Sequence, residues 1–486
     1  MSCTTVLLGK KATNDGSTMI ARTEDFMFEP KKMAVMNPED QPRKYKSVGG
    51  HLTIDLPDEP MRYTACPNAD PATGIWAATG INEANVGMTA TETTSTNPRV
   101  QAVDPLLKYT GEKDSDGNEI PCGIGEEDMV VLVLPYIRTA REGVLRLGAL
   151  LEKYGTYEMN GIAFNDKDEC WWLETIGGHH WIARRVRDEE VVIMPNQFGM
   201  DRFDMDDAFG DQKENLCSAD LREFINDNFL DLGQDNVFNP RNAFGSRSSH
   251  DHVYNTPRAW YMGRTLCPAK YKWDGEDADF TPTSNNIPWS LVPERKLAAE
   301  DVAELLSSHY EDTPYDPFAK FAEKPGIYRP IGINRTGCTG ICQIRGYLPE
   351  ELQAVQWVSF ASTAYSAFVP LYTNVSKVPG YMSDVTTDAS TENLYWASRL
   401  INALADHSYG ASALKILRYK NAIASCGRGI ILEYDRKMTE AGKFDLFEEA
   451  NEKIVSMAKA ETTKCLNEVL LNASKNMKNG YTRWDN

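Results

Sequence analysis

Long hydrophobic runs are missing from this sequence. A membrane-spanning helix needs about 18 or more consecutive apolar residues, and no stretch approaches that length. A signal peptide is not indicated either, because the opening apolar run at residues 4–8 is short and Lys10 and Lys11 follow it instead of preceding it. We therefore expect a soluble, cytoplasmic protein that has no membrane partner.

Positive charge is scarce relative to negative charge. The chain has 51 Lys and Arg residues against 70 Asp and Glu residues, which gives a formal net charge of −19. The electric field of such a protein repels nucleic acid and anionic membrane surfaces. The charge balance therefore argues against a nucleic-acid partner and is compatible with a soluble enzyme that acts on small substrates.

The patterns of a disulfide framework and of a metal site are also lacking. The ten cysteines are scattered over 486 residues, so we expect most of them to be reduced and buried. His250 and His252 flank Asp251, but neighbouring side chains on an extended chain diverge, and no third ligand follows at a diagnostic spacing. Cys338 and Cys342 are interpreted as two core thiols. We expect no metal and no organic cofactor.

What the sequence does contain is enough apolar material for a large core. The chain has 486 residues, of which 42% are hydrophobic. Strand patterns occur toward both ends, whereas helical patterns lie between and after them, and this order favours the α+β class. We expect a single domain over residues 1–486, with a helical C-terminal portion from about residue 384.

The middle of the chain has the clearest strand signal. Residues 161–165, 170–175 and 180–186 are separated by polar turns and predict an antiparallel meander, which residues 191–198 close. An acidic run at residues 126–128 precedes a helical pattern, and its negative charge suits the first turn of a helix.

The amino-terminal segment, residues 1–25, has the pattern of a β-hairpin. Cys3 leads a β-branched run, a turn-rich stretch follows at residues 12–17, and a second short strand comes next. A tight turn would pair Cys3 with Phe28, whereas a wider loop places Cys3 opposite Arg22. We favour the second register, because it brings together the parts of a reactive site.

In that register the Cys3 thiol is activated. A thiol beside the guanidinium of Arg22 and the carboxylate of Asp25 is biased toward the thiolate form. A chain-terminal α-amino group has a pKa near about 8 and can act as a general base without a histidine. Cys3 becomes the first residue when only Met1 and Ser2 are lost, and we expect that maturation. The alternative is an ordinary buried cysteine at the start of a core strand.

Several short motifs carry a resemblance to a known family. They are Cys3-Thr4-Thr5, Gly9-Lys10-Lys11, Asp15-Gly16-Ser17 and the run 21–25, with further similar segments at 254–260 and 355–372. They resemble the dipeptidase-A family of lactic-type bacteria, cysteine N-terminal-nucleophile hydrolases that are related to secernins and, more distantly, to choloylglycine hydrolase and penicillin V acylase. The resemblance implies the four-layer αββα sandwich of N-terminal-nucleophile hydrolases.

The resemblance also implies further site residues. Asn196 follows a buried strand at the place where the acylase relatives carry an oxyanion-donating asparagine, and Arg258 lies in the segment that resembles the one with the late active-site arginine. Glu92 matches a stretch that lines the substrate cleft, and it is the candidate ligand for the ammonium group of a dipeptide, with Asp25 as runner-up. The alternatives are a turn asparagine that caps its own backbone, a surface arginine at a helix start and an exposed strand-end carboxylate.

Together these observations predict acyl transfer to water by a cysteine-dependent dipeptidase. The Cys3 thiolate attacks a peptide carbonyl, its α-amino group moves the proton, Asn196 supports the oxyanion, and water resolves the thioester. Arg22 and Asp25 poise the nucleophile, while Arg258 stabilises the site. The expected partners are small peptide substrates. An amidase of larger acyl amides, of the bile-salt or penicillin type, and a non-catalytic secernin-like protein stay open as alternatives, as does a homo-oligomer.

Overall fold

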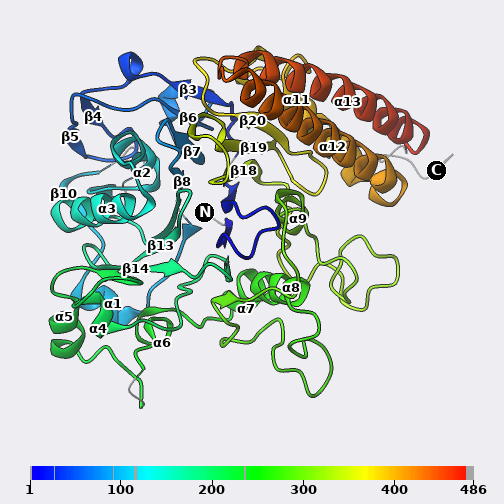
Figure 1. Cartoon of the computed structure of the whole chain (residues 1–486). Helices are drawn as coiled ribbons and strands as arrows, with labels where there is room; N and C mark the ends of the chain where they lie inside the picture. Colours follow the sequence, from blue (N-terminus) through cyan, green and yellow to red (C-terminus); the bar gives the residue numbers. More distant parts are fainter. Residues whose placement is uncertain are drawn as a thin grey trace.

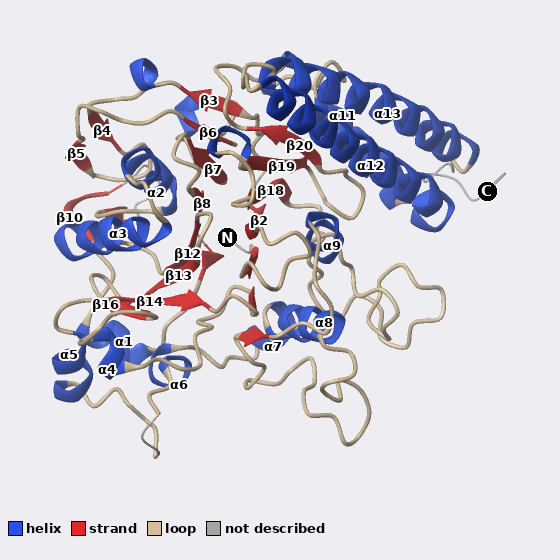
Figure 2. Ribbon diagram, in the orientation of Figure 1, coloured by secondary structure: helices blue, strands red, loops and turns tan. Residues whose placement is uncertain are grey.

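The computed structural model describes residues 3–26, 28–90, 92–113, 117, 119–234 and 237–477. It contains two large antiparallel sheets, with helices on their outer sides (Figure 1). Figure 2 shows the strands gathered in the middle of the molecule and the helices around them. The predicted α+β class is therefore confirmed. Met1 and Ser2, whose loss is expected, lie outside the described residues.

The amino-terminal hairpin forms the middle of the first sheet. Strands β1 (Thr4–Leu8) and β2 (Thr18–Asp25) pair with each other, and every residue of both strands is buried. The remaining strands are β15 (Val191–Met194), β17 (Ser290–Leu291), β18 (Thr336–Ile344), β19 (Ala354–Phe360) and β20 (Val369–Tyr372), in the order β17-β15-β1-β2-β18-β19-β20. Because both faces of this strand pair are buried, other parts of the protein must pack against each face of the sheet.

The second sheet supplies one of those covers. Its order is β16-β14-β13-β12-β8-β7-β6-β3, and β9 pairs with β12 beside β8. The strands are β3 (Ala34–Met36), β6 (Tyr63–Ala65), β7 (Thr79–Asn82), β8 (Gly87–Thr89), β9 (Glu92–Thr93), β12 (Asn160–Asn165), β13 (Cys170–Thr175), β14 (Trp181–Val186) and β16 (Asn215–Cys217). Two small hairpins lie outside both sheets, β4 (Lys44–Lys46) with β5 (Thr53–Asp55) and β10 (Lys108–Lys113) with β11 (Glu119–Pro121).

The two sheets pack face to face. Strands β2 and β18 of the first sheet contact β7, β8 and β12 of the second sheet. One core cluster fills the space between them and includes Leu7, Ile20 and Trp172. Where β18 passes β7, a Cβ atom on Gly340 of β18 would lie only 2.2 Å from Oγ1 of Thr79 on β7. Glycine is therefore required there for the sheets to meet.

Helices cover the outer faces. α2 and α3 pack on the second sheet, whereas α8, α9 and α11–α13 pack on the first, and separate core clusters fill these two interfaces (Figure 1). The helices are α1 (Pro98–Val103), α2 (Glu126–Val133), α3 (Ala140–Tyr154), α4 (Met205–Ala208), α5 (Leu221–Asp227), α6 (Pro240–Phe244), α7 (Asp251–Tyr254), α8 (Thr256–Leu266), α9 (Ala299–Leu305), α10 (Gly380–Ser383), α11 (Leu394–Asp406), α12 (Tyr409–Ala441) and α13 (Phe447–Lys475). Four 3₁₀ turns are Pro38–Asp40, Pro71–Thr73, Leu134–Tyr136 and Glu350–Leu352. No helix in the described ranges is long and apolar enough to cross a membrane.

The predicted meander is correct for three strands and wrong for the fourth. β12, β13 and β14 follow one another in the second sheet. β15 (Val191–Met194), which was expected to close the meander, instead crosses to the first sheet and pairs with β1. All four of its residues are buried, so this strand is apolar on both faces and fits the interior of either sheet.

Candidate active site

Cys3 lies immediately before β1 and is in contact with Arg22. The Nη2 atom of Arg22 donates a hydrogen bond to the Cys3 Sγ at 3.0 Å. The predicted register is wrong, because the strands pair Thr5 with Arg22 and Thr4 with Thr23. Residues two apart on a strand share a face, so the long arginine reaches Cys3 diagonally from its position opposite Thr5. The predicted contact is therefore present, although the pairing that was expected to produce it is not.

The predicted bias of this thiol toward thiolate is wrong for this structure. Burial raises the pKa of Cys3 to about 12, and the positive charge of Arg22 offsets only part of that effect. The carboxylates of Glu92, Glu126 and Asp25 raise the pKa further. Cys3 has no exposed surface. The thiol is therefore neutral at pH 7 in this environment.

Glu126 is the ion-pair partner of Arg22. It is the first residue of α2, and its Oε1 accepts a hydrogen bond from the same Nη2 atom that contacts Cys3. Both side chains are buried, so solvent and salt screen the pair only weakly. The Nη1 atom of Arg22 donates to the carbonyl oxygen of Ala78 at 3.4 Å. Cys3 and Glu126 therefore share one nitrogen of a single guanidinium group.

Glu92 lies inside the protein, so the alternative of an exposed strand-end carboxylate is wrong. It begins β9, where it pairs with Gly161, and none of its surface is exposed. Its Oε2 accepts a hydrogen bond from the Thr5 hydroxyl at 2.6 Å. Burial raises the pKa of Glu92 to about 7, although the charge of Arg258, the Thr5 hydrogen bond and the charge of Arg22 act in the opposite direction. Glu92 thus changes its charge near neutral pH.

Asp25 stabilises the backbone beside the predicted nucleophile. It forms a buried ion pair with Arg329 and accepts a hydrogen bond from the Thr336 hydroxyl at 2.6 Å. The Thr23 hydroxyl donates to Asp25 at 3.0 Å and accepts the backbone N–H of Thr4, also at 3.0 Å. The Thr23 hydroxyl therefore links the Asp25 carboxylate to the backbone N–H of Thr4 at the start of β1.

Arg258 holds the same backbone from α8. Its Nη1 donates to the carbonyl oxygen of Cys3 and, at 2.7 Å, to the hydroxyl of Thr4. Its Nη2 donates to the Oδ1 atoms of Asn196 at 2.8 Å and of Asn255 at 2.9 Å. The guanidinium is fully buried, so the alternative of a surface arginine is wrong. Burial and the charge of the nearby Arg329 lower the pKa of Arg258 to about 9.

Asn196 joins this network from the turn after β15. Its Nδ2 donates to the carbonyl oxygen of Thr93 at 2.9 Å, while its Oδ1 accepts from Arg258. The alternative of an asparagine that caps its own backbone is therefore wrong. Because Thr93 follows Glu92 in β9, the network connects the end of the second sheet with the start of β1. The structure thus brings Cys3, Arg22, Glu92, Asn196 and Arg258 together from separate parts of the chain.

Comparisons with known proteins identify the family of this chain. A family model described as peptidase family C69 matches residues 2–422. The chain belongs to peptidase family C69. A dipeptidase of Bifidobacterium longum is 48% identical, with 99% of each chain covered. A probable dipeptidase A of Streptococcus pyogenes is 48% identical over 100% of this chain and 98% of the relative, and a probable dipeptidase B of Lactococcus lactis is 42% identical over 98% and 97%. The predicted dipeptidase-A-type family and the predicted peptidase class are confirmed.

Two charged residues of the cluster around Cys3 were not predicted. Glu126 belongs to the acidic run 126–128, which is visible in the sequence. That run was interpreted only as favourable negative charge at a helix start, and not as the source of a partner for Arg22. Arg329, the partner of Asp25, lies in a loop and has no distinguishing sequence context. Buried charged side chains need counter-charges, and that requirement is the only general reason to search for such partners.

The histidines around Asp251 do not converge on one point. His250 stacks on Tyr254 with ring centroids 4.3 Å apart, whereas the Nε2 of His252 lies 3.1 Å from the Oδ1 of Asn285. In the part of the C69 peptidase that the structure describes, no group of three His, Cys, Asp or Glu residues is placed to hold a metal ion.

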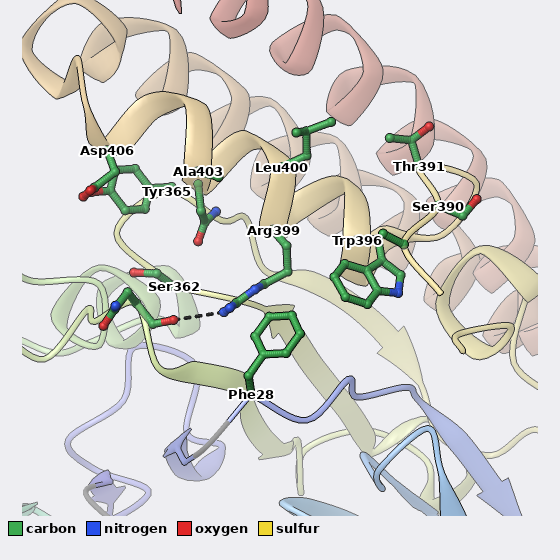
Figure 3. A pocket seen from close by; sticks show the side chains of 13 residues that line it. Phe28, Ser362, Tyr365, Ser390, Thr391, Trp396, Arg399, Leu400, Ala403 and Asp406 are labelled. Atoms are coloured by element: carbon green, nitrogen blue, oxygen red, sulfur yellow. Dashed lines mark hydrogen bonds between the residues drawn. The ribbon is translucent and has the colours of Figure 1, made fainter. Parts of the chain in front are cut away.

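A separate cavity of about 570 Å³ lies beside α11. Figure 3 shows Arg399 extending from this helix toward Phe28, with its hydrogen bond to the carbonyl oxygen of Asn334 drawn as a dashed line. The guanidinium carbon of Arg399 lies 4.3 Å from the centre of the Phe28 ring. Among the described residues that line this cavity there is none of the predicted site residues. This cavity is therefore separate from the cluster around Cys3.

Proposed function

We propose that the protein is a cysteine-dependent dipeptidase that acts through a thioester on Cys3. The observation that carries the proposal is the continuous network in which Arg22 contacts the Cys3 thiol, Arg258 holds the Cys3 carbonyl, and Asn196 is bonded to Arg258. The printed names of the similar proteins, which include a dipeptidase and probable dipeptidases A and B, support the choice of dipeptides as substrates.

The reaction has two acyl-transfer steps. The Cys3 sulfur attacks the carbonyl carbon of the peptide bond, while the α-amino group of Cys3 takes the thiol proton and delivers it to the departing amine. The developing oxyanion is stabilised by donated hydrogen bonds, with the amide of Asn196 as the candidate donor. Water, deprotonated by the same amino group, then attacks the thioester and releases the first amino acid together with free Cys3.

The chemistry requires that Cys3 become the amino-terminal residue. Loss of Met1 and Ser2 converts the nitrogen of Cys3 from a peptide nitrogen into a free amine, which has a pKa near about 8 and can act as a base at neutral pH. Cys3 has no exposed surface in this structure, so substrate access also requires a change in what covers it.

The proposal includes the architecture and location expected of such an enzyme. The two facing sheets with helices on both outer sides support the four-layer αββα sandwich of N-terminal-nucleophile hydrolases, in one domain over residues 1–486. All ten cysteines are free, which supports a reducing, cytoplasmic environment.

The test is to trap the acyl-enzyme. The purified enzyme is mixed with a dipeptide, quenched in acid during turnover and digested, and the peptide that contains Cys3 is weighed by mass spectrometry. We expect a mass increase equal to that of the amino-terminal amino acid of the substrate minus one water, and we expect it to be absent in Cys3→Ser. Full dipeptide hydrolysis by an enzyme in which Cys3 is completely alkylated would exclude this function.

A further inference from the structure

The environment of Cys3 contains more negative charge than activation of a thiol requires. Arg22 and Glu24 from β2, Glu92 from β9 and Glu126 from α2 all contribute to the electrostatics of this region, and Arg258 approaches from α8. Asp25 contributes from the end of β2 but is paired with Arg329. Glu24 has its own counter-ion, Lys31, at 2.5 Å.

The Oε2 of Glu24 has no hydrogen-bond partner among the described residues, but the charge of Glu24 is balanced by Lys31. Glu158 also faces Glu126 and accepts a hydrogen bond from its backbone N–H, and burial together with the charge of Glu126 raises the pKa of Glu158 to about 7. Besides Asp25, Glu92 and Glu126 are the two carboxylates whose charges act directly on the Cys3 thiol, and neither has a lysine partner among the described residues.

Each of these two carboxylates has one oxygen atom that is bonded and one that is not. The Oε2 of Glu92 accepts from Thr5, and the Oε1 of Glu126 accepts from Arg22. The Oε1 of Glu92 and the Oε2 of Glu126 are buried and find no hydrogen-bond partner among the described residues. A buried acceptor without a donor is costly, so two such atoms close to a reactive thiol indicate a place for a ligand that donates hydrogen bonds.

An ammonium group has the matching chemistry. It carries three N–H donors and one positive charge, and it has no acceptor. The free amino end of a dipeptide provides this group, whereas an N-acylated substrate does not. Two carboxylate oxygens can therefore distinguish the two kinds of substrate by charge as well as by hydrogen bonding.

Glu126 differs from Glu92 because it also controls Arg22. Its Oε1 and the Cys3 Sγ contact the same Nη2 atom, and both side chains of the ion pair are buried. The negative charge of Glu126 offsets the positive charge of Arg22 that would otherwise stabilise a thiolate. A cation bound to Glu126 would balance that negative charge and leave the field of Arg22 to act on the sulfur.

We propose that Glu126 acts together with burial and Glu92 to keep the Cys3 thiol neutral until the ammonium group of a dipeptide binds beside Glu126, and that this substrate cation then releases Arg22 to stabilise the thiolate. The proposal rests on the proposed function. The bond that breaks is S–H, and its proton passes to the α-amino group of Cys3, so no additional reagent is needed. Glu126 is thus a positioning residue that couples substrate recognition to ionisation of the nucleophile.

The experiment is a pH titration of the Cys3 thiolate in the matured enzyme. The thiolate is followed by its ultraviolet absorbance, as the difference between each protein and the same protein carrying Cys3→Ser. The probes are L-alaninol, which has an ammonium group but no carbonyl to hydrolyse, and N-acetyl-L-alaninol. Glu126→Gln removes the charge with little change of shape. Glu127→Gln is the matched control, because Glu127 lies at the same helix start but bonds to the backbone N–H groups of Val48 and Gly49.

We expect L-alaninol to lower the titration midpoint of wild type by about one to three pH units, and N-acetyl-L-alaninol to leave it unchanged. Glu126→Gln should titrate at lower pH than wild type without any probe and should not respond to L-alaninol. Glu127→Gln should behave as wild type. A second variant, Glu126→Asp, keeps an acidic residue at the helix start but has a shorter side chain. Its titration midpoint should lie between those of wild type and Glu126→Gln. This variant tests the proposal even if Glu126→Gln does not fold.

Two results would overturn the proposal. One is a titration midpoint of the Cys3 thiolate in Glu126→Gln that is equal to or above the wild-type midpoint. The other is a wild-type midpoint that does not change when L-alaninol is added. Kinetics separate this proposal from the dipeptidase function itself. If the enzyme hydrolyses dipeptides but the titration does not show the expected shifts, the dipeptidase function stands and the coupling through Glu126 is excluded. If the titration shows the expected shifts but no dipeptide is hydrolysed, the control of the thiol by Glu126 stands and the dipeptidase function is excluded.

Discussion

The Nη2 of Arg258 donates a hydrogen bond to the Oδ1 of Asn196 at 2.8 Å. This contact, together with the bond from the Asn196 Nδ2 to the Thr93 carbonyl, fixes which end of the amide donates and which end accepts. A donor that is held in place before the reaction costs no reorganisation when negative charge develops on the substrate. These two contacts support the proposal that Asn196 is a preorganised oxyanion donor.

Asn196→Ala is expected to lower kcat by about a hundredfold or more, with little change in KM, because the donor acts mainly in the transition state. Steady-state kinetics on one dipeptide measure both constants. Gln197→Ala is the control, since Gln197 lies next in the chain but donates to the Ser246 carbonyl instead. If Asn196→Ala changed only KM, Asn196 would belong to substrate binding and not to the chemical step.

Cys3→Ala should abolish hydrolysis and leave the fold intact. The thiol performs the chemistry, whereas its small volume at the start of β1 contributes little to packing. Cys3→Ser should keep at most a trace of activity, because a hydroxyl ionises far less readily than a thiol. Cys465→Ala, which removes another buried thiol in α13, should keep full activity. Activity and thermal unfolding are measured on all three variants, and an active Cys3→Ala would exclude Cys3 as the nucleophile.

The active form is expected to begin at Cys3. Removal of the initiator methionine would still leave Ser2 on the nitrogen that must act as the base, so Ser2 has to be lost as well. Mass spectrometry of the intact active enzyme reads its first residue directly. An enzyme that is fully active with Met1 or Ser2 in place would show that the α-amino group is not the base.

The parts of the site that could be predicted lie close to recognisable local patterns. Cys3 leads a strand, whereas Asn196 and Arg258 became candidates because their segments resemble those of a known family. The pairing of β1 with β2 differed from the prediction, yet Arg22 still reaches Cys3. The reason is that the side-chain period of a strand is two, so the register that was predicted and the one that is observed keep both residues on the same face.

The parts that could not be predicted depend on long-range packing. Glu126 lies 104 positions from Arg22, and Arg329 lies 304 positions from Asp25. No local pattern connects such pairs, because only the folded arrangement of sheets and helices brings them together. The neutral state of the Cys3 thiol was missed for the same reason, since burial and the charges of Glu92 and Glu126 arise from tertiary structure.

Gly340→Ala tests the close approach of the two sheets. The added Cβ would lie 2.2 Å from the Oγ1 of Thr79, which is held by a hydrogen bond from Gln356 at 2.8 Å. The free energy of unfolding should fall by about 1–3 kcal/mol, as for other overpacked cores. Gly429→Ala is the control, because Gly429 is exposed in α12 with open space around it, and it should gain about 0.5–1 kcal/mol. Urea denaturation measures both, and equal stability of the two variants would contradict this packing.

Glu92→Gln tests how the enzyme distinguishes a dipeptide from an acylated amide. The pKa of Glu92 is raised to about 7 by burial, so its carboxyl group is neutral below that pH and negative above it. Only the negative form attracts an ammonium group, and KM for a free dipeptide should therefore fall as the pH rises through about 7. In Glu92→Gln this pH dependence of KM should disappear, and discrimination against the N-acetylated dipeptide should shrink. Equal turnover of the free and acetylated forms by wild type would favour an amidase of larger acyl amides.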